Sequence, residues 1–133
     1  MTIDFHTHIL PPWLRDQRDR WLGRDSTFGA LYSDPKAKIA SVEDLLKIMD
    51  EDDIDRAVVM GMGWTDAGLA REVSDYIIEA VRDNPSRLTG FAGLNPAWGS
   101  EVALEVDRCA RAGLRGVGEL HPDTQGYDLG DEG

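Results

Sequence analysis

The chain opens with a run in which apolar and polar residues alternate, Ile3-Asp4-Phe5-His6-Thr7-His8. A period of two is typical of a β-strand, whose successive side chains point to opposite faces. On that count Asp4, His6 and His8 share one face of the strand. Two imidazoles placed two residues apart on one strand face can reach the same metal ion, so this strand is also the first candidate for chemistry.

Three helices and three further strands follow from the pattern. Ser41 and Asp44 stand at capping-box spacing before an apolar stripe with helical spacing, which predicts a helix from about residue 42. A second helix is expected over about 67–83, and a third after Ser100, its expected N-cap. Apolar runs of strand length predict strands at 55–61, 87–94 and 114–120.

The order β-α-β-α-β-α-β indicates an α/β fold with a parallel sheet and right-handed crossovers. The 133 residues are too few for two ordinary domains, so residues 1–133 are expected to form one. A long segment at about 9–41, in which Pro11-Pro12 predicts a short helix, separates the first strand from the first long helix. It is either a solvated surface insertion or a lid in which an arginine recognises a substrate carboxylate.

Composition narrows the class of protein. Hydrophobic residues make up 41% of the chain and charged residues 29%, as in soluble globular proteins. The net charge of −11 argues against nucleic-acid binding, and no apolar run has the length of a membrane span. A single cysteine, Cys109, excludes an internal disulfide and favours a cytoplasmic setting.

Unusual polar and aromatic residues gather where the expected strands end, and the carboxyl ends of parallel strands share one rim. Besides the two histidines these residues are Trp64, Asn95, Trp98, Glu119 and His121. A carboxylate at a buried strand end is costly without a metal or a cation, so we expect Glu119 to be a ligand.

The remaining candidates leave alternatives open. His121 is a substrate contact, a further ligand or an ordinary loop residue. Trp64 and Trp98, with Asn95, are expected to contact substrate, although tryptophans in such places often serve packing alone. Asp4 is expected to contact the residues that bind the metal instead of binding the ion itself.

These residues also carry a family resemblance. The Asp-x-His-x-His pattern of the first strand and the run Gly116-Val117-Gly118-Glu119-Leu120-His121-Pro122 resemble the amidohydrolase-2 branch of the amidohydrolase superfamily, which includes aminocarboxymuconate-semialdehyde decarboxylase-like enzymes. The resemblance implies the N-terminal half of a (β/α)8 TIM-like barrel. It also implies a divalent metal, expected to be zinc, held by His6, His8 and Glu119, with the catalytic base beyond Gly133.

The implied function is metal-dependent hydrolysis of a small molecule. The ion would lower the pKa of a bound water, which then attacks an amide, ester or lactone carbonyl. Half a barrel is expected to have little activity alone. A decarboxylase of the same family, a TatD-type nuclease and a non-catalytic α/β interaction domain are the alternatives. A homodimer that completes or covers the half-barrel is also expected, and residues 126–133 are expected to be a linker.

Overall fold

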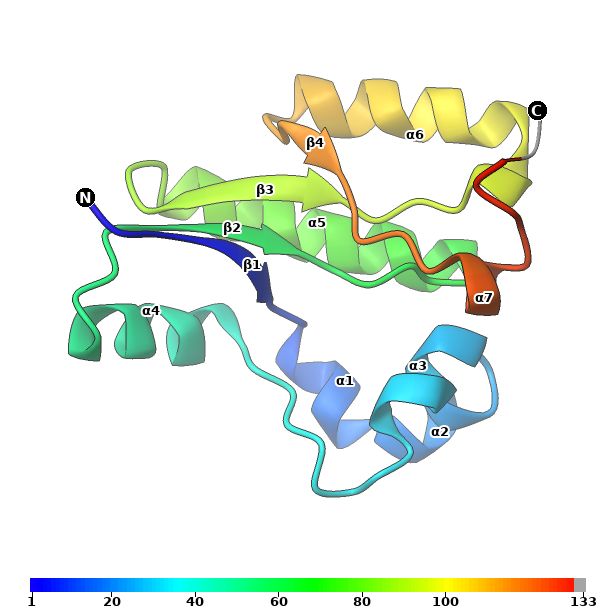
Figure 1. Cartoon of the computed structure of the whole chain (residues 1–133), viewed down its shortest axis with the longest axis horizontal. Coiled ribbons are helices and arrows are strands. Elements are labelled where there is room, and N and C mark those ends of the chain that lie inside the picture. The colour runs from blue at the N-terminus through cyan, green and yellow to red at the C-terminus, as the bar shows by residue number, and fades with distance from the viewer. Residues whose placement is uncertain (131–133) are drawn as a thin grey trace.

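The computed structural model describes residues 1–130 and has the alternating order expected from the sequence (Figure 1). Within that range four parallel strands form a sheet in the order β1-β2-β3-β4: β1 (Ile3–His8), β2 (Arg56–Met60), β3 (Leu88–Ala92) and β4 (Gly116–Val117). Helices α4 (Val42–Glu51), α5 (Ala67–Asp83) and α6 (Ser100–Arg111) connect them. The expected α/β half-barrel order is confirmed. No helix in the described range is long and apolar enough to cross a bilayer.

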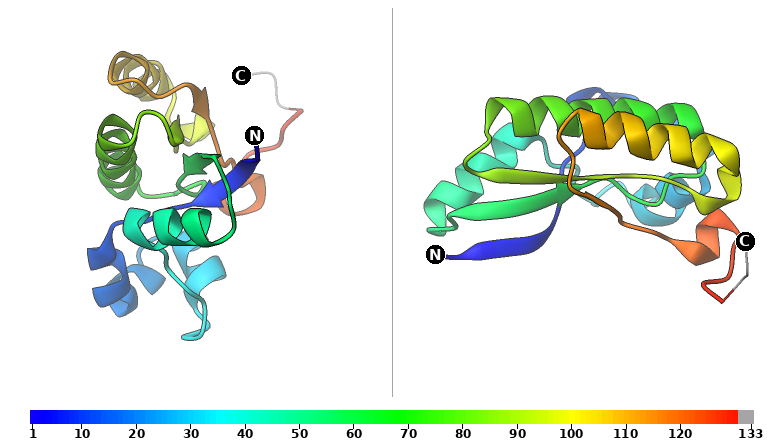
Figure 2. Two further views of the ribbon diagram at one scale, coloured as in Figure 1. Left: turned by 90° about the vertical axis from the view of Figure 1, so that its left-hand side faces the viewer. Right: turned by 90° about the horizontal axis from the view of Figure 1, so that it is seen from above.

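Helices cover one face of the sheet only. Figure 2 shows α5 and α6 on the same side of the strands. On that side α5 approaches β3 so closely that a Cβ added at Gly90 would lie 2.8 Å from Ile77 and 2.6 Å from Leu114. On the uncovered face Ile3 is 52% exposed and Phe5 67%. The sheet therefore presents an apolar surface to solvent, as expected for an open half-barrel.

The pairing of β1 with β2 carries a register shift between Asp4 and Thr7. Asp4 pairs with Ala57. His8 pairs with Met60, three residues further along β2. Ala57 and Met60 are three residues apart on β2, so their side chains point to opposite faces of the sheet. Because paired residues of neighbouring strands share a face, Asp4 and His8 also point to opposite faces. The expected common face therefore holds for the two histidines, whose ring centroids lie 4.9 Å apart, and is wrong for Asp4.

Three other expectations differ from the structure at element ends. The fourth strand was expected over 114–120 and comprises only Gly116–Val117. Ser100 is the first residue of α6, and Gly99 occupies the N-cap without a side-chain bond. A short helix, α7 (Pro122–Gln125), follows the fourth strand where a loop was expected. Of the expected linker at 126–133, residues 131–133 lie outside the described range.

The insertion after β1 folds into three short helices, α1 (Pro12–Asp16), α2 (Arg18–Leu22) and α3 (Ser26–Tyr32). Leu14 and Phe28 have no exposed surface, so these helices extend the core and are not a solvated loop. The guanidinium of Arg18 donates to the carbonyls of Asp34 (2.9 Å) and Ala37 (2.6 Å). The Arg18 guanidinium therefore binds backbone carbonyls within the insertion, and this arginine is not held ready for a substrate carboxylate.

Candidate metal centre

Three side chains converge at the carboxyl-end rim of the sheet. His6 Nε2 lies 2.7 Å from Glu119 Oε2, and His8 Nε2 lies 3.3 Å from the same oxygen. The two Nε2 atoms are 3.0 Å apart. Residues 113 positions apart in sequence thus meet, because β1 and β4 both direct their carboxyl ends to this rim.

The triangle of atoms fits a divalent cation. With metal–ligand bonds of about 2.0–2.2 Å and angles between tetrahedral and octahedral, neighbouring ligand atoms lie about 2.8–3.6 Å apart. The three separations in the structure, 2.7, 3.0 and 3.3 Å, lie at or near that range. Two imidazole nitrogens and one carboxylate oxygen suit zinc, manganese and similar ions. His6 is 61% exposed, which leaves one side of the site open.

His8 is oriented by the neighbouring strand. Its Nδ1 lies 3.1 Å from the carbonyl oxygen of Gly61, the residue that follows β2. A carbonyl only accepts hydrogen bonds, so Nδ1 carries the proton and Nε2 presents a lone pair toward Glu119 and His6. Asp4 acts on His6 through the backbone, because its Oδ1 accepts the His6 N–H at 3.2 Å.

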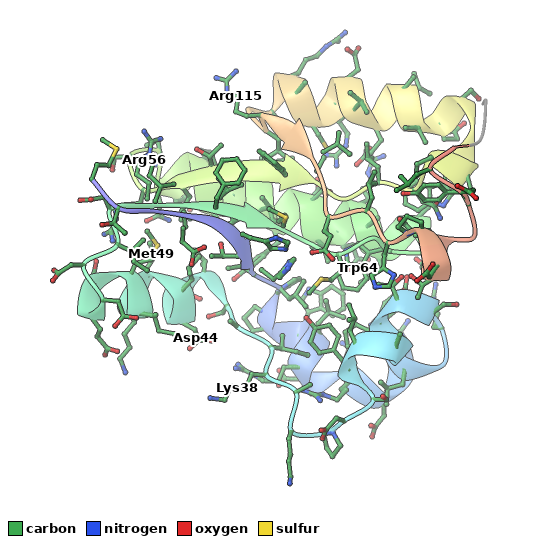
Figure 3. The ribbon with its side chains drawn as sticks, viewed as in Figure 1. Lys38, Asp44, Met49, Arg56, Trp64 and Arg115 are labelled. Carbon is green, nitrogen blue, oxygen red and sulfur yellow. The ribbon has the colours of Figure 1, made fainter. Side chains whose placement is uncertain are left out.

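Of the other candidates, His121 follows Glu119 by two residues in the sequence. It lines, together with Glu119, a pocket of about 590 Å³. Trp64 is fully buried and packs against Phe28, with ring centroids 6.2 Å apart, so its ring is a core element out of reach of substrate (Figure 3). The histidine therefore shares a pocket with one of the three candidate ligands, whereas the tryptophan does not.

Asn95 and Trp98 also lie away from the triangle. Asn95 is buried, and its Oδ1 accepts the Ala97 N–H at 3.0 Å, which caps the 3-10 helix η1 (Pro96–Trp98). Trp98 lines a separate groove between α5 and α6, together with Arg71 and Leu104. Both residues follow β3 as expected, but the chain turns there toward the helices, so neither meets Glu119.

The structure adds Tyr32, which the sequence did not single out. Burial raises the pKa of the Tyr32 phenol to about 12, the charge of Arg18 lowers it in part, and the charge of Glu119 raises it further. Tyr32 on α3 is thus within electrostatic range of Glu119 and stays protonated. Its spacing of four from Phe28 was a helix signal, but nothing in an aperiodic segment indicated which residues would reach the site.

Solved structures of similar fold come from enzymes with different reactions. One is a 5-carboxyvanillate decarboxylase from Novosphingobium aromaticivorans complexed with manganese (21% identity, TM-score 0.73, 97% of this chain and 44% of that chain). Another is a 4-oxalomesaconate hydratase from Rhodopseudomonas palustris (23% identity, TM-score 0.62, 99% of this chain and 45% of that chain). A third is a probable 2-pyrone-4,6-dicarboxylic acid hydrolase from Acinetobacter baumannii (18% identity, TM-score 0.53, 87% of this chain and 36% of that chain). The chain spans less than half the length of each, and at these identities the likeness concerns the fold.

A comparison with curated proteins gives no match. The family model described as Amidohydrolase, in contrast, matches residues 3–133. It extends from the first strand, with His6 and His8, through Glu119 and beyond, so the expected resemblance is confirmed. This chain belongs to the amidohydrolase family.

Proposed function

We propose that His6, His8 and Glu119 hold a divalent metal ion in an enzyme that acts on a small organic molecule. The observation that carries this proposal is the triangle of two Nε2 atoms and one carboxylate oxygen, 2.7–3.3 Å apart. The Gly61 carbonyl supports it, since it fixes the metal-binding tautomer of His8. When bound, such an ion polarises a substrate oxygen or acidifies a water molecule.

Hydrolysis of an amide, ester or lactone is the reaction we propose first. Within this chain, the buried Tyr32 phenol stays protonated within electrostatic range of Glu119. Glu119 and the two histidines orient the ion and leave its exposed side to the substrate. The group that moves the proton during bond cleavage is proposed to lie beyond Gly133, so the chain alone should turn over slowly.

Decarboxylation is the second candidate, and a specific finding favours it. Structures of similar fold include decarboxylases of 5-carboxyvanillate and 2,6-dihydroxybenzoate, the former with manganese. The same three ligands serve either reaction, because both need a cation beside an oxygen of the substrate. The metal itself is proposed to be zinc or manganese, since the donor set suits both.

Calorimetric titration of the metal-free chain with zinc chloride and, separately, manganese chloride tests the metal site. We expect one ion per chain. His8→Ala and Glu119→Gln should each weaken binding about tenfold or more, since each removes a ligand. Glu101→Gln, which changes an exposed carboxylate on α6, serves as the matched control and should bind like the unmodified chain. Equal affinity in all four proteins would contradict the proposal.

A further inference from the structure

His121 is connected to the insertion by two threonine hydroxyls. Its ring Nδ1 lies 3.1 Å from Thr124 Oγ1 on α7. Thr124 Oγ1 in turn contacts Thr27 Oγ1 on α3. Thr27, which has no exposed surface, donates its hydroxyl proton to the carbonyl oxygen of Gly63 at 2.6 Å. We call Thr124 and Thr27 the hydroxyl chain.

Counting protons along the hydroxyl chain fixes the tautomer of His121. The carbonyl of Gly63 only accepts, so the single hydroxyl proton of Thr27 is committed there. The Thr27 oxygen then accepts from Thr124, whose single proton is committed in turn. The Thr124 oxygen must therefore accept from His121 Nδ1–H. The alternative acceptor for Thr124, the His121 carbonyl at 3.3 Å, leaves Nδ1 as the donor all the same.

The position of the His121 ring is fixed as well. The His121 backbone N–H donates to Gln125 Oε1 at 2.8 Å, and Gln125 Nε2 donates to the carbonyls of Leu94 (2.8 Å) and Trp64 (3.1 Å). A Cβ added at Gly63 would lie only 2.5 Å from the His121 nitrogen and 2.8 Å from its Cβ. The loops after β2 and β3 thus hold His121 in one place.

We propose that His121 is a specificity-determining residue that presents an unprotonated Nε2 to the substrate as a hydrogen-bond acceptor. Among the described residues, no hydrogen bond to Nε2 is found. The pocket of about 590 Å³ that His121 lines is also lined by the acidic residues Glu119, Asp123 and Asp128 and by Tyr127, and its lining residues include no lysine or arginine. Apart from the Tyr127 phenol, the polar side chains of this lining accept hydrogen bonds, so next to His121 they match a hydroxyl or amino group of the substrate and disfavour a carboxylate at that position.

This inference rests on the proposed function only for placing the pocket beside a metal centre. The tautomer and its cause can be measured without metal or turnover. Long-range proton–nitrogen NMR spectra of the labelled chain distinguish the two tautomers. At alkaline pH, where histidine rings are neutral, His121 should show Nδ1–H and a bare Nε2. With three histidines in the chain, a His121→Gln spectrum identifies its signals.

Variants of the hydroxyl chain test whether the Thr124 hydroxyl sets the tautomer of His121. Thr124→Val removes the acceptor for Nδ1–H, so the Nε2–H form should become populated, whereas Thr124→Ser keeps the hydroxyl and should keep the tautomer. Thr89→Val, a half-buried threonine on β3, is the matched control and should leave the ring unchanged. An Nε2–H ring in the unmodified chain, or an unaltered tautomer in Thr124→Val, would overturn the proposal.

The ligand class is tested with two probes of similar size, phenol and benzoate. Phenol donates a hydrogen bond and should shift the Nε2 signal of His121, and benzoate should not. A larger shift with benzoate, or none with phenol, contradicts the acceptor role. Zinc titration of Thr124→Val should give the affinity of the unmodified chain, so failure of the metal site and failure of this inference give different results.

Discussion

Asp25 shows how a single side chain joins the insertion to the rim of the sheet. Its carboxylate, 1% exposed, accepts the backbone N–H groups of Phe28 (2.8 Å), Thr65 (2.7 Å) and Asp66 (2.8 Å). One oxygen caps α3 and the other holds the loop that follows β2. The position of α3 over the site therefore depends on this residue.

Replacing Asp25 by Ala should lower the free energy of unfolding by about 2–4 kcal/mol, because one buried and two partly buried N–H groups lose their acceptor. Urea denaturation measures the difference. The exposed Asp19 on α2 provides the control, and Asp19→Ala should change stability by less than about 0.5 kcal/mol. Equal effects of the two substitutions would show that Asp25 does not fix the insertion.

Tyr32 gives a pH-dependent prediction. Burial raises its pKa from the ordinary 10.0 to about 12, so the folded chain holds this proton more tightly than the unfolded chain does. The associated stability is fully present below pH 10 and is lost as the pH rises toward 12. Ultraviolet titration should show a late phenol ionisation that Tyr32→Phe removes. If the late step survives the substitution, the assignment to Tyr32 is wrong.

At the scale of elements, α4 begins with the capping box that the sequence indicates. Ser41 Oγ accepts the Asp44 N–H at 3.3 Å, and Asp44 Oδ2 accepts the Ser41 N–H at 2.9 Å. The bond from the Ser41 backbone, followed by that from its hydroxyl, lowers the pKa of Asp44. The contribution of this carboxylate to stability is therefore present near neutral pH and is lost as the pH falls through its lowered pKa.

Ser41→Ala should destabilise the chain by about 1 kcal/mol at neutral pH, since an N-cap oxygen is lost. The same substitution at Ser33, which is exposed and follows α3, is the control and should have little effect. Thermal unfolding followed by circular dichroism compares the two. A Ser33 variant as unstable as the Ser41 variant would contradict a specific role of the cap.

Elements with a long, clear period were predictable and the rest were not. α5 was expected at about 67–83 and spans Ala67–Asp83, because its apolar positions repeat over several turns. The helices of the insertion are five to seven residues long, too short for a period to appear. The one readable signal for α3 is Asp25, a residue type that favours the N-cap position, directly before Ser26-Thr27-Phe28.

The candidate site was predictable to the extent that it is local. The i,i+2 histidines come from one strand, so their proximity follows from the backbone alone. The register shift that turns Asp4 to the other face depends on β2 and leaves no trace in the sequence of β1. Tyr32 and the hydroxyl chain depend on how the insertion docks, which is a tertiary property.

At the scale of the whole molecule, the uncovered face of the sheet is the main consequence of the architecture. Its exposed apolar side chains are large and contiguous enough to favour association. They include Ile3 and Phe5, and the Phe5 ring meets that of Phe91 on β3 at a centroid distance of 6.3 Å. The net charge of −11 opposes contact between copies, so we expect salt to promote it. A homodimer that covers this face is the assembly we propose.

Sedimentation velocity tests that assembly. The chain should dimerise more readily at high salt, and Phe5→Ser should weaken the dimer about tenfold, because a largely exposed aromatic ring becomes buried only at the interface. Leu129 is 77% exposed and lies outside the sheet, so Leu129→Ser is the control. A chain that stays monomeric at every salt concentration would contradict the dimer. Equal effects of Phe5→Ser and Leu129→Ser on dimerisation would contradict it as well.

The measurement that bears most directly on the metal centre is X-ray absorption spectroscopy of the zinc-loaded chain. We expect scattering from two imidazole rings and at least one carboxylate oxygen at about 2.0–2.2 Å. His8→Ala should reduce the imidazole contribution to one ring. A spectrum of an ion surrounded by oxygen alone, unchanged in His8→Ala, would contradict the claim that His6, His8 and Glu119 form a metal site.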